Sequence, residues 1–483
     1  YPFQLDEQVM PEKHPLVGAC KVIAQENTSL RCRVIDVVWP GENARTTLVD
    51  NLIAELQGGA IDPMIAYRDQ QRWVQVFQPV PLKPRQLQAT RFRYRGVYMI
   101  SGGFGKVSTV LAEYLARTFQ ARLVLLGRSP LPEREQWSHW VRTHEEQNQI
   151  SQRIRHVQHL EDLGAEVLPL QVDVANVVQL CEAVNLATAH FGVLHGVIHA
   201  ATAVGAEIFR VVPDMSRAAC EQHFGAKAYG LYALDEALKG HQLDFCILFS
   251  SLSSILGGLS LVGYTAANLF MDAYVDWHNR QPNASPWISV NWDTWKFPGQ
   301  DHGVLGASIA TYALTPEEGC EALERILMSD LRHVILSTGD LALRVRQWIL
   351  LEGIHSQEHD NGHLPVPSVV HTIVQREDYE RVVTAIWRDV LGVEQVGLDE
   401  NFFELGGNSL TGLQVIASLR KALHIQLPVV ALFEAPTIHA MIAYLQASTP
   451  MSPKAEQPAK LQLEQRRSQA RKSLIERDIA IVA

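Results

Sequence analysis

Four polar side chains stand at a spacing that could carry proton-transfer chemistry. Ser251 precedes Tyr264 by thirteen residues, Asn268 follows the tyrosine by one helical turn, and Lys227 lies twenty-four residues before the serine. A phenol, an ammonium and a hydroxyl can together donate a proton to a forming oxyanion and stabilise its charge. Each residue taken alone is more often a satisfied polar group or a surface side chain. The set of four, in this order, favours a catalytic site.

A glycine-rich stretch at 99–116, MISGGFGKVSTVLAEYLA, offers a second kind of chemistry. Its first three glycines directly follow an apolar run that predicts a strand, and a helical pattern begins at about residue 106. Glycines there let the backbone approach a pyrophosphate, and the amides of a helix N-terminus favour an anion. The stretch therefore predicts a dinucleotide site that includes Ser101, Gly102, Gly103, Phe104, Gly105 and Lys106.

Polar residues also follow the next two predicted strands. Arg128 ends the run ARLVLLGR, where a cation can meet the 2′-phosphate of NADP(H), and Asp173 ends EVLPLQVDV, where it can contact the adenine end. A surface arginine and a helix-capping aspartate explain them equally well when each is taken alone. Because ligands lie outside the carboxyl ends of such strands, their joint position favours a nucleotide site, which also takes in Ser129, Val174 and Ala200.

Apolar runs alternate with amphipathic helical stretches from residue 97 to 340. Continuous apolar strands separated by helices indicate a parallel sheet covered on both faces, so the predicted fold class is α/β, a Rossmann-like doubly wound sheet. Strands are expected at 97–101, 121–128, 166–174, 196–201, 245–251, 287–292 and 333–338, and the charged stretch 133–163 is expected to be one long helical segment. Two runs nearer the N-terminus, CKVIAQE and LRCRVIDVVW, also look like strands.

The composition argues against several classes of protein. The 483-residue chain is too long for one ordinary core, and its net charge of −10 without a basic stripe predicts no nucleic-acid binding. The six cysteines are scattered and no Cys/His cluster is present, so we expect no metal site and reduced thiols in the cytoplasm. The uncharged stretch 245–271 could mimic a membrane span, but its serines and glycines fit a buried strand and an active-site loop better, so no membrane contact is expected.

With these residues in place, the sequence resembles the ketoreductase domains of modular polyketide synthases, members of the short-chain dehydrogenase/reductase superfamily. Most of that superfamily has Tyr-x-x-x-Lys, whereas these ketoreductases have Tyr-x-x-x-Asn with the lysine upstream, the arrangement of Tyr264, Asn268 and Lys227. The resemblance covers about 1–345. It implies a partial structural subdomain at 1–95, carried by GACKVIAQENTSLRCRVIDV, and a catalytic subdomain at 96–345.

The resemblance also implies the reaction. A β-keto thioester would be reduced with NADPH, Tyr264 would donate the proton, and Ser251 would hydrogen-bond the carbonyl oxygen. The Lys227 ammonium would lower the pKa of the phenol, which is ordinarily about 10, and Asn268 would order the lysine or a water chain.

The glycine-rich turn departs from the family pattern, which usually reads T-G-G-x-G-G-x-G. Ser101 replaces the threonine, Lys106 and Ser108 replace two glycines, and Thr202 stands where the family commonly has another glycine. One interpretation is a modified but competent NADPH site in which Lys106 touches a phosphate. The alternative is a catalytically inactive, structural ketoreductase.

A second motif, DENFFELGGNSLTGLQVIASLRKAL at 399–423, resembles the phosphopantetheine attachment site of acyl and peptidyl carrier proteins, with Ser409 as the attachment serine. A glycine turn with a serine N-cap is the alternative for the motif alone. Helical patterns on both sides complete a small four-helix carrier domain at 375–446, in which Leu410, Leu413, Val415 and Ile416 would face the core or a partner. Nine Asp/Glu against five Lys/Arg between residues 376 and 445 suit docking to basic patches.

The resemblance therefore implies a segment of a larger synthase. Linkers are expected at 346–374 and 447–476, and residues 477–483 resemble the start of a ketosynthase domain. The implied partners are a carrier-bound acyl substrate, ketosynthase and acyltransferase domains, and a phosphopantetheinyl transferase that loads 4′-phosphopantetheine onto Ser409. A stand-alone dehydrogenase of small molecules is a further alternative, which the Ser409 motif disfavours.

Overall fold

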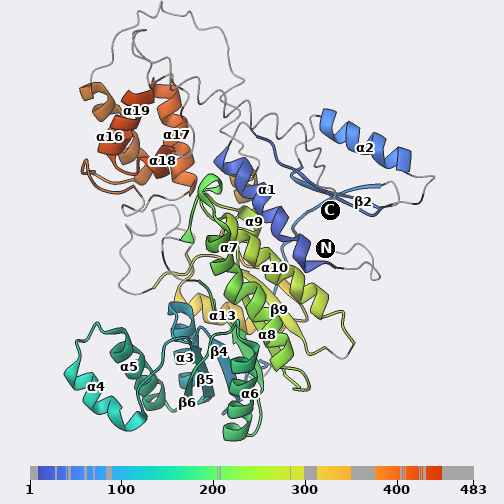
Figure 1. Cartoon of the computed structure of the whole chain (residues 1–483), viewed down its shortest axis with the longest axis vertical. Coiled ribbons are helices and arrows are strands. Elements are labelled where there is room, and N and C mark those ends of the chain that lie inside the picture. Colours follow the sequence, from blue (N-terminus) through green and yellow to red (C-terminus); the bar gives the residue numbers. More distant parts are fainter. Residues whose placement is uncertain are drawn as a thin grey trace, which may run out of the picture. The chain divides into compact units, whose positions relative to one another are not determined.

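The computed structural model of the chain describes residues 9–27, 30–39, 41, 45–58, 62–68, 71–82, 90–203, 205, 208–282, 284–297, 313–349, 376–402, 405, 407, 409–423, 425, 427 and 431–448. The chain divides into two compact units, and each is described here by itself. Figure 1 labels many of their helices and strands. The first unit contains a seven-stranded sheet, and the second contains a three-stranded sheet and most of the C-terminal helices.

The seven-stranded sheet of the first unit is parallel throughout, in the order β10-β9-β8-β7-β4-β5-β6. Its strands are β4 (Val97–Ser101), β5 (Arg122–Gly127), β6 (Glu166–Gln171), β7 (Gly196–His199), β8 (Phe245–Ser251), β9 (Trp287–Trp292) and β10 (His333–Ile335). The chain starts at the centre with β4, runs outward through β5 and β6, and returns to β7 on the other side of β4. The predicted α/β doubly wound sheet is thus confirmed, with a topological switch point between β4 and β7.

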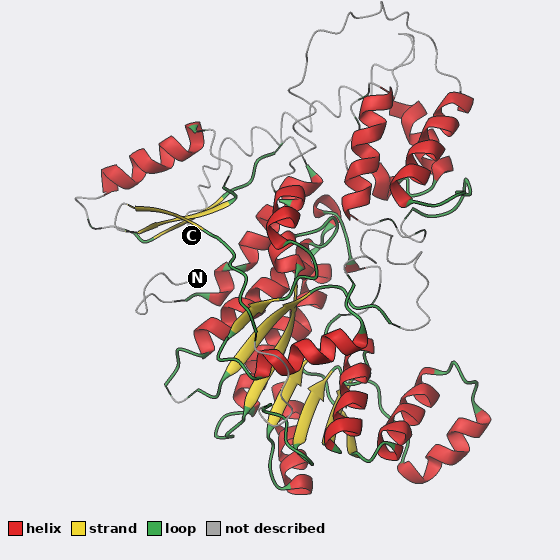
Figure 2. Ribbon diagram, turned by 180° about the vertical axis from the view of Figure 1, so that it is seen from behind, coloured by secondary structure: helices red, strands yellow, loops and turns green. Residues whose placement is uncertain are grey.

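Helices cover both faces of this sheet, as the red ribbons around the yellow strands in Figure 2 show. The helices of the first unit are α1 (Pro15–Glu26), α3 (Lys106–Phe119), α4 (Trp137–Thr143), α5 (Gln149–Asp162), α6 (Val177–Phe191), α7 (Arg217–Phe224), α8 (Gly230–Ala237), α9 (Ser253–Leu256), α10 (Val262–His278), α13 (Pro316–Leu327) and α14 (Leu341–Trp348). Short 3-10 turns lie at Pro11–Lys13, Arg134–Gln136 and Val212–Asp214, and a π-helical turn joins α7 to α8 at Gly225–Tyr229.

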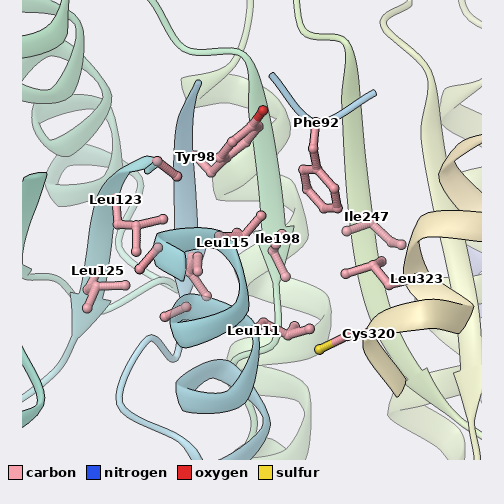
Figure 3. Packing of buried hydrophobic residues seen from close by; sticks show 14 of the residues in the cluster. Phe92, Tyr98, Leu111, Leu115, Leu123, Leu125, Ile198, Ile247, Cys320 and Leu323 are labelled. Atoms are coloured by element: carbon pink, nitrogen blue, oxygen red, sulfur yellow. The ribbon is translucent and has the colours of Figure 1, made fainter. Parts of the chain in front are cut away.

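Alternation along the strands divides the core into two apolar layers. On one face, Tyr98, Leu123 and Ile247 pack against α3, α5 and α13. On the other face, Met99, Val124 and Leu248 pack against α6, α8 and α10. Figure 3 shows part of the first layer, in which Leu111 and Leu115 of α3 point toward the sheet. Strands buried on both faces in this way explain the continuous apolar runs of the sequence.

Two expectations for the helices and strands are wrong. CKVIAQE forms the end of α1, not a strand. Pro15 begins this helix, and its buried residues, including Val17, Gly18 and Val22, follow a helical period that packs on α10, so tertiary burial overrides the β-branched composition. The stretch 133–163 is not one helical segment either, because α4 ends at Thr143 and Asn148 caps a separate helix, α5.

The second unit contains β1 (Val34–Val37), α2 (Arg45–Gln57), β2 (Met64–Arg68) and β3 (Gln71–Val74). The second predicted N-terminal strand is therefore confirmed as β1, which pairs in parallel with β2, while β3 pairs antiparallel to β2. Further along the chain come α16 (Arg376–Leu391), α17 (Ser409–Leu423), α18 (Ala431–Glu434) and α19 (Ile438–Ser448). Trp387 packs edge-on against Phe402, and their rings lie in the core of this helical domain.

The described helices include none that is long and apolar enough to cross a bilayer. The described residues also contain no group of three His, Cys, Asp or Glu side chains that could hold a metal ion. The helix α14 runs to Trp348, past the predicted domain end at residue 345. Likewise α19 runs to Ser448, past the predicted carrier end at residue 446. Apart from residues 346–349 and 447–448, the predicted linkers and the predicted ketosynthase start lie outside the described residues.

Candidate active site and carrier site

The glycine-rich turn follows β4 at the switch point of the sheet. Gly102 has φ +65°, and a Cβ there would lie 2.9 Å from the Cα of Ala201. A Cβ at Gly103 would lie 2.9 Å from the Cβ of Leu125. Gly102 thus requires glycine for both backbone conformation and close packing, and Gly103 requires it for close packing alone. The turn therefore packs closely against the carboxyl ends of β5 and β7.

The N-terminus of α3 has the features of an anion site. Gly105 is its N-cap residue, and no side chain in the described part of the chain caps the helix. Its first amides therefore remain free to meet an acceptor, and the exposed Lys106 adds a cation beside them. The three replacements of family glycines leave this end open, because Ser108 is buried within α3 while Lys106 and Thr202 are exposed. The turn therefore fits a dinucleotide.

The other predicted nucleotide contacts gather at the same edge of the sheet. Arg128 and Ser129 follow β5 and are exposed. Asp173 follows β6, and its carboxylate accepts a hydrogen bond from the Ala175 amide at 3.0 Å, so it stabilises the turn before α6. The helix itself is capped by Asn176, so the simpler interpretation of Asp173 as a helix cap is wrong. The buried Val174 and the half-buried Ala200 complete the set.

Phe104 has neighbours that the sequence did not single out. A Cβ at Gly127 would lie 2.9 Å from its ring, so the glycine makes room for the phenyl group. The Arg153 guanidinium lies 5.5 Å from the ring centre, and the His156 ring lies edge-on at 6.5 Å. Burial lowers the pKa of His156 to about 4, so this imidazole is neutral beside the arginine near neutral pH.

Lys227 lies in the π-helical turn between α7 and α8, and only 2% of the residue is exposed. Its ammonium donates to the Phe249 carbonyl at 3.1 Å and contacts the Met271 sulfur at 3.5 Å. It also lies 5.5 Å from the centre of the Tyr264 ring. Burial lowers the pKa of Lys227 to about 8, against the opposing effect of the Asp272 carboxylate. The predicted lysine–tyrosine neighbourhood is present.

Tyr264 lies in the first turn of α10, and Ser251 ends β8. Burial raises the pKa of the Tyr264 phenol, while hydrogen bonds to Ser251 and Asn268 oppose the shift. The expectation that the neighbouring ammonium lowers this pKa is therefore wrong for the structure, because desolvation dominates. The Ser251 hydroxyl accepts from the Ser253 amide at 3.1 Å, which leaves its own proton to donate.

Asn268 is fully buried one turn after the tyrosine. Its Nδ2 donates to the Tyr264 carbonyl at 2.9 Å. Its Oδ1 has no hydrogen-bond partner among the described residues. A buried acceptor of this kind is usually satisfied by water or by a ligand. The Oδ1 of Asn268 can therefore accept a hydrogen bond from a water molecule, as its predicted role of ordering the lysine or a water chain requires.

A buried polar network beneath these residues was not predicted. The Asn291 amide donates to the Ser254 hydroxyl at 2.7 Å and to the Asp272 carboxylate at 2.8 Å. The Ser289 hydroxyl donates to the same carboxylate at 2.5 Å. Polar residues inside the otherwise apolar strand WISVNW were the available signal, since such residues are seldom buried without a partner.

The helix α1 supplies further contacts that sequence reasoning missed. The Lys21 ammonium donates to the Ser254 carbonyl at 2.6 Å. The Gln25 amide donates to the Leu256 carbonyl at 2.7 Å and accepts from the Gly258 amide at 2.7 Å. Glu26 accepts from the Ser260 amide at 2.9 Å. Three side chains of one helix thus hold the backbone of the loop that connects Ser251 to Tyr264.

The predicted attachment residue Ser409 begins α17. Val415 and Ile416 of that helix are buried, whereas the side chains of Ser409, Leu410 and Leu413 lie outside the described part. The loop before the helix is tied to the connection between α18 and α19 through the amide of Phe402, which donates to the Pro436 carbonyl at 2.7 Å. Its partner Trp387 comes from α16, so the described contacts connect three parts of the helical domain.

Comparison with family models finds two matching regions in the chain. Residues 96–297 match the KR domain model, and residues 381–445 match the phosphopantetheine attachment site model. The first match contains Lys227, Ser251, Tyr264 and Asn268, and the second contains Ser409.

Curated relatives are large synthases. The chain is 26% identical over 449 residues to polyketide synthase PksN of Bacillus subtilis, and this alignment covers 89% of the chain and 8% of that protein. It is 30% identical to polyketide synthase PksM of the same organism, with 59% of the chain and 6% of that protein covered. The 5-methyl-1-naphthoate synthase of Streptomyces sahachiroi is 25% identical, with 90% of the chain and 24% of that protein covered. The chain thus spans a small part of each relative.

Solved structures share the fold. A ketoreductase domain from the bacillaene assembly line superposes with a TM-score of 0.58 at 24% identity, covering 71% of the chain and 78% of that structure. A structure of A-type ketoreductases from a modular polyketide synthase gives a TM-score of 0.55 at 23% identity, covering 70% and 66%.

Proposed function

We propose that this chain, a polyketide synthase segment with a KR domain followed by a phosphopantetheine attachment domain, reduces a carrier-bound β-ketoacyl thioester to the β-hydroxyacyl thioester with NADPH. The observation that carries the proposal is the convergence of Lys227, Ser251, Tyr264 and Asn268, with Ser251 at the carboxyl end of β8, on the edge of the parallel sheet where β4 leads into the open N-terminus of α3. These residues come from three separate elements, and the sheet brings them to the edge where its ligands are expected.

Tyr264 is the proton donor in this proposal. Its raised pKa keeps the phenol protonated near neutral pH, which is the state a donor needs. A secondary alkoxide is a far stronger base than a phenolate, so the proton moves from Tyr264 to the new hydroxyl oxygen without a lowered phenol pKa. The Ser251 hydroxyl hydrogen-bonds the same oxygen and stabilises the charge that forms on it.

The phenolate left on Tyr264 then takes up a proton from solvent, and Lys227 and Asn268 assist this step. The Lys227 ammonium lies over the tyrosine ring, and a cation there stabilises the phenolate left by the transfer. The free Oδ1 of Asn268 can accept from a water molecule that connects this region to solvent. The lysine therefore acts on the charged product of the step and not on the resting phenol.

The nucleotide would be held at the carboxyl edge of β4, β5 and β6. The first amides of α3 and Lys106 would bind the pyrophosphate, Arg128 and Ser129 the 2′-phosphate, and Asp173 and Val174 the adenine end. When bound, NADPH supplies a hydride to the β-carbonyl carbon. Ala200, half-buried beside the turn, would lie along the same nucleotide.

The carrier domain delivers the substrate. Ser409 would carry 4′-phosphopantetheine, attached by a phosphopantetheinyl transferase, and the acyl chain would be a thioester on that arm. Because the reductase and the carrier belong to one chain, the local substrate concentration is high and tight binding of the acyl group is unnecessary. Ketosynthase and acyltransferase domains are the partners that this scheme requires. The acidic composition of the carrier domain suits docking to basic sites on them.

The test is NADPH oxidation by the full chain with a small-molecule β-keto thioester. Wild-type protein should consume NADPH in preference to NADH, and Tyr264→Phe should lower kcat by about a hundredfold or more while the Kd of NADPH stays within about twofold. Absence of NADPH binding at millimolar concentration would show the inactive, structural alternative instead. Full activity of the Tyr264→Phe variant would exclude Tyr264 as the proton donor.

The carrier assignment has a separate test. Incubation with coenzyme A and a phosphopantetheinyl transferase should add one phosphopantetheine group to the chain, seen by mass spectrometry. Ser409→Ala should abolish the addition, while Ser448→Ala, at the end of α19, should leave it intact. A modification that persists in Ser409→Ala would place the arm elsewhere.

A further inference from the structure

His199 connects the glycine-rich turn to the π-helical turn that carries Lys227. It is the last residue of β7, is 1% exposed, and has both ring nitrogens hydrogen-bonded. Nδ1 lies 2.8 Å from the Ser101 hydroxyl, and Nε2 lies 3.0 Å from the Ala226 carbonyl. Ser101 ends β4 directly opposite His199 in the sheet register, and Ala226 immediately precedes the lysine.

The partners fix the direction of these hydrogen bonds. The Ala226 carbonyl can only accept, so Nε2 carries the ring proton and Nδ1 is the acceptor. The Ser101 hydroxyl therefore donates to Nδ1, and its oxygen accepts from the Ala201 amide at 3.4 Å. The result is a buried chain of hydrogen bonds that runs one way, from the Ala201 amide through Ser101 and His199 to Ala226.

The surroundings hold this tautomer. Burial and the nearby Lys227 ammonium lower the pKa of His199 to about 4, so the imidazole stays neutral near neutral pH. A second proton would leave Ser101 facing a donor and would place two cations side by side in the interior. The ring therefore serves as a rigid, uncharged connector between two backbone segments.

We propose that His199 is a positioning residue that sets the glycine-rich turn and the Lys227-bearing π-helical turn in register across the switch point of the sheet. The inference rests on the proposed reductase function, because the two segments it joins are those assigned there to the nucleotide and to the proton transfer. His199 itself contacts neither the phenol nor the ammonium in any described hydrogen bond. Its effect on the reaction is transmitted through Ser101 on one side and Ala226 on the other.

The two halves of this role can be separated by amide substitutions. The side-chain amide of asparagine reaches about as far as Nδ1, and that of glutamine about as far as Nε2. His199→Asn should therefore keep the Ser101 contact and lose the Ala226 contact, while His199→Gln should do the reverse. Each loses one buried hydrogen bond, for which an effect of about tenfold is expected.

The kinetic result should split between the variants. His199→Asn should lower kcat about tenfold and leave the Kd of NADPH within about twofold, since the turn at Gly102 keeps its support. His199→Gln should raise the Kd of NADPH about tenfold and leave kcat at saturation within about threefold. His139→Asn and His139→Gln, on the exposed face of α4, are the matched controls and should change neither quantity.

A second measurement does not depend on activity. Amide hydrogen exchange of the full chain should rise at 102–105 in His199→Gln and at 225–229 in His199→Asn. Ser101→Ala, which removes the donor to Nδ1 and leaves the histidine in place, should reproduce the exchange pattern of His199→Gln and serves if either histidine variant does not fold. Equal exchange changes at both segments in all variants, or none at either, would overturn the proposal. Wild-type protein that neither binds nor oxidises NADPH would refute the reductase function. The exchange pattern would then still test whether His199 connects the glycine-rich turn to the π-helical turn.

Discussion

The Lys227 ammonium lies over the face of the Tyr264 ring, 5.5 Å from its centre, while it donates to the carbonyl of Phe249. A cation over the face of a ring is attracted by its quadrupole, and the attraction increases when the phenol becomes a phenolate. The lysine is also buried, so its charge is costly to maintain and its pKa falls to about 8. The two effects make the protonation of Lys227 the pH-sensitive part of the site.

The first prediction concerns the pH profile. Lys227 is charged below about pH 8 and neutral above it, so kcat for β-keto thioester reduction should decline as pH rises through about 8. Lys227→Arg keeps the charge at high pH and should remove this decline, although the larger guanidinium should lower the maximal rate. The measurement is kcat against pH from 6 to 10.

The control for that profile is a second buried lysine. Burial also lowers the pKa of Lys21 to about 8, but its ammonium binds the Ser254 carbonyl and not the tyrosine region. Lys21→Met should lower the rate uniformly and retain the decline near pH 8. A profile that loses its decline in Lys21→Met and keeps it in Lys227→Arg would contradict the assignment.

The second prediction concerns Asp272, the buried carboxylate of α10. It raises the pKa of both Lys21 and Lys227 against the effect of burial, and it accepts hydrogen bonds from Ser289 and Asn291. Asp272→Asn removes that negative charge, so the pKa of Lys227 should fall and the decline in kcat should begin at lower pH. Asp276→Asn, one turn later on α10, is the control and should leave the profile unchanged. An unshifted profile in Asp272→Asn would exclude this electrostatic role.

The third prediction separates backbone strain from close packing in the glycine-rich turn. Gly102 and Gly192 both have positive φ, at +65° and +85°, but only Gly102 has a neighbouring backbone that a Cβ would meet. Gly192→Ala should cost about 1 kcal/mol of unfolding free energy through strain alone. Gly102→Ala should cost about 2 to 4 kcal/mol, because the contact with Ala201 adds to the strain, and it should weaken NADPH binding. Urea unfolding of the two variants measures the difference, and equal losses would remove the packing argument.

The sequence predicted the parts of the fold that have strong local patterns. The seven strands of the sheet are continuous apolar runs. The glycine-rich turn is a short local motif, and Lys227, Tyr264 and Asn268 follow it along the chain at recognisable spacings. It failed for CKVIAQE, where Val22 and Ile23 suggest a strand but burial against α10 selects a helix. It also gave the wrong direction for the pKa of Tyr264, because desolvation depends on how neighbouring elements close over a side chain.

Contacts between distant segments were the least accessible to sequence reasoning. His199 pairs with Ser101 and Ala226 only because the strand order places β7 beside β4 and the π-helical turn above it. Gln25 meets Leu256 across more than two hundred residues, and no local pattern marks either residue. From sequence alone, a polar side chain of this kind is expected on the surface. Only the tertiary structure shows which buried backbone groups it hydrogen-bonds.

The fourth prediction tests how α1 supports the active-site loop. Gln25 is buried, donates to the carbonyls of Leu256 and Trp348, and accepts from the Gly258 amide, so its loss leaves three backbone groups without this partner. Gln25→Leu keeps the approximate volume and should cost about 2 to 4 kcal/mol of unfolding free energy, since buried polar groups left unsatisfied are expensive. Leu16→Ala, at an exposed position of the same helix, should change stability by about 0.5 kcal/mol or less. Because the loop connects Ser251 to Tyr264, Gln25→Leu should also lower kcat about tenfold at temperatures where the protein remains folded. A variant that loses stability but keeps full kcat would show that α1 supports the fold and not the geometry of the loop.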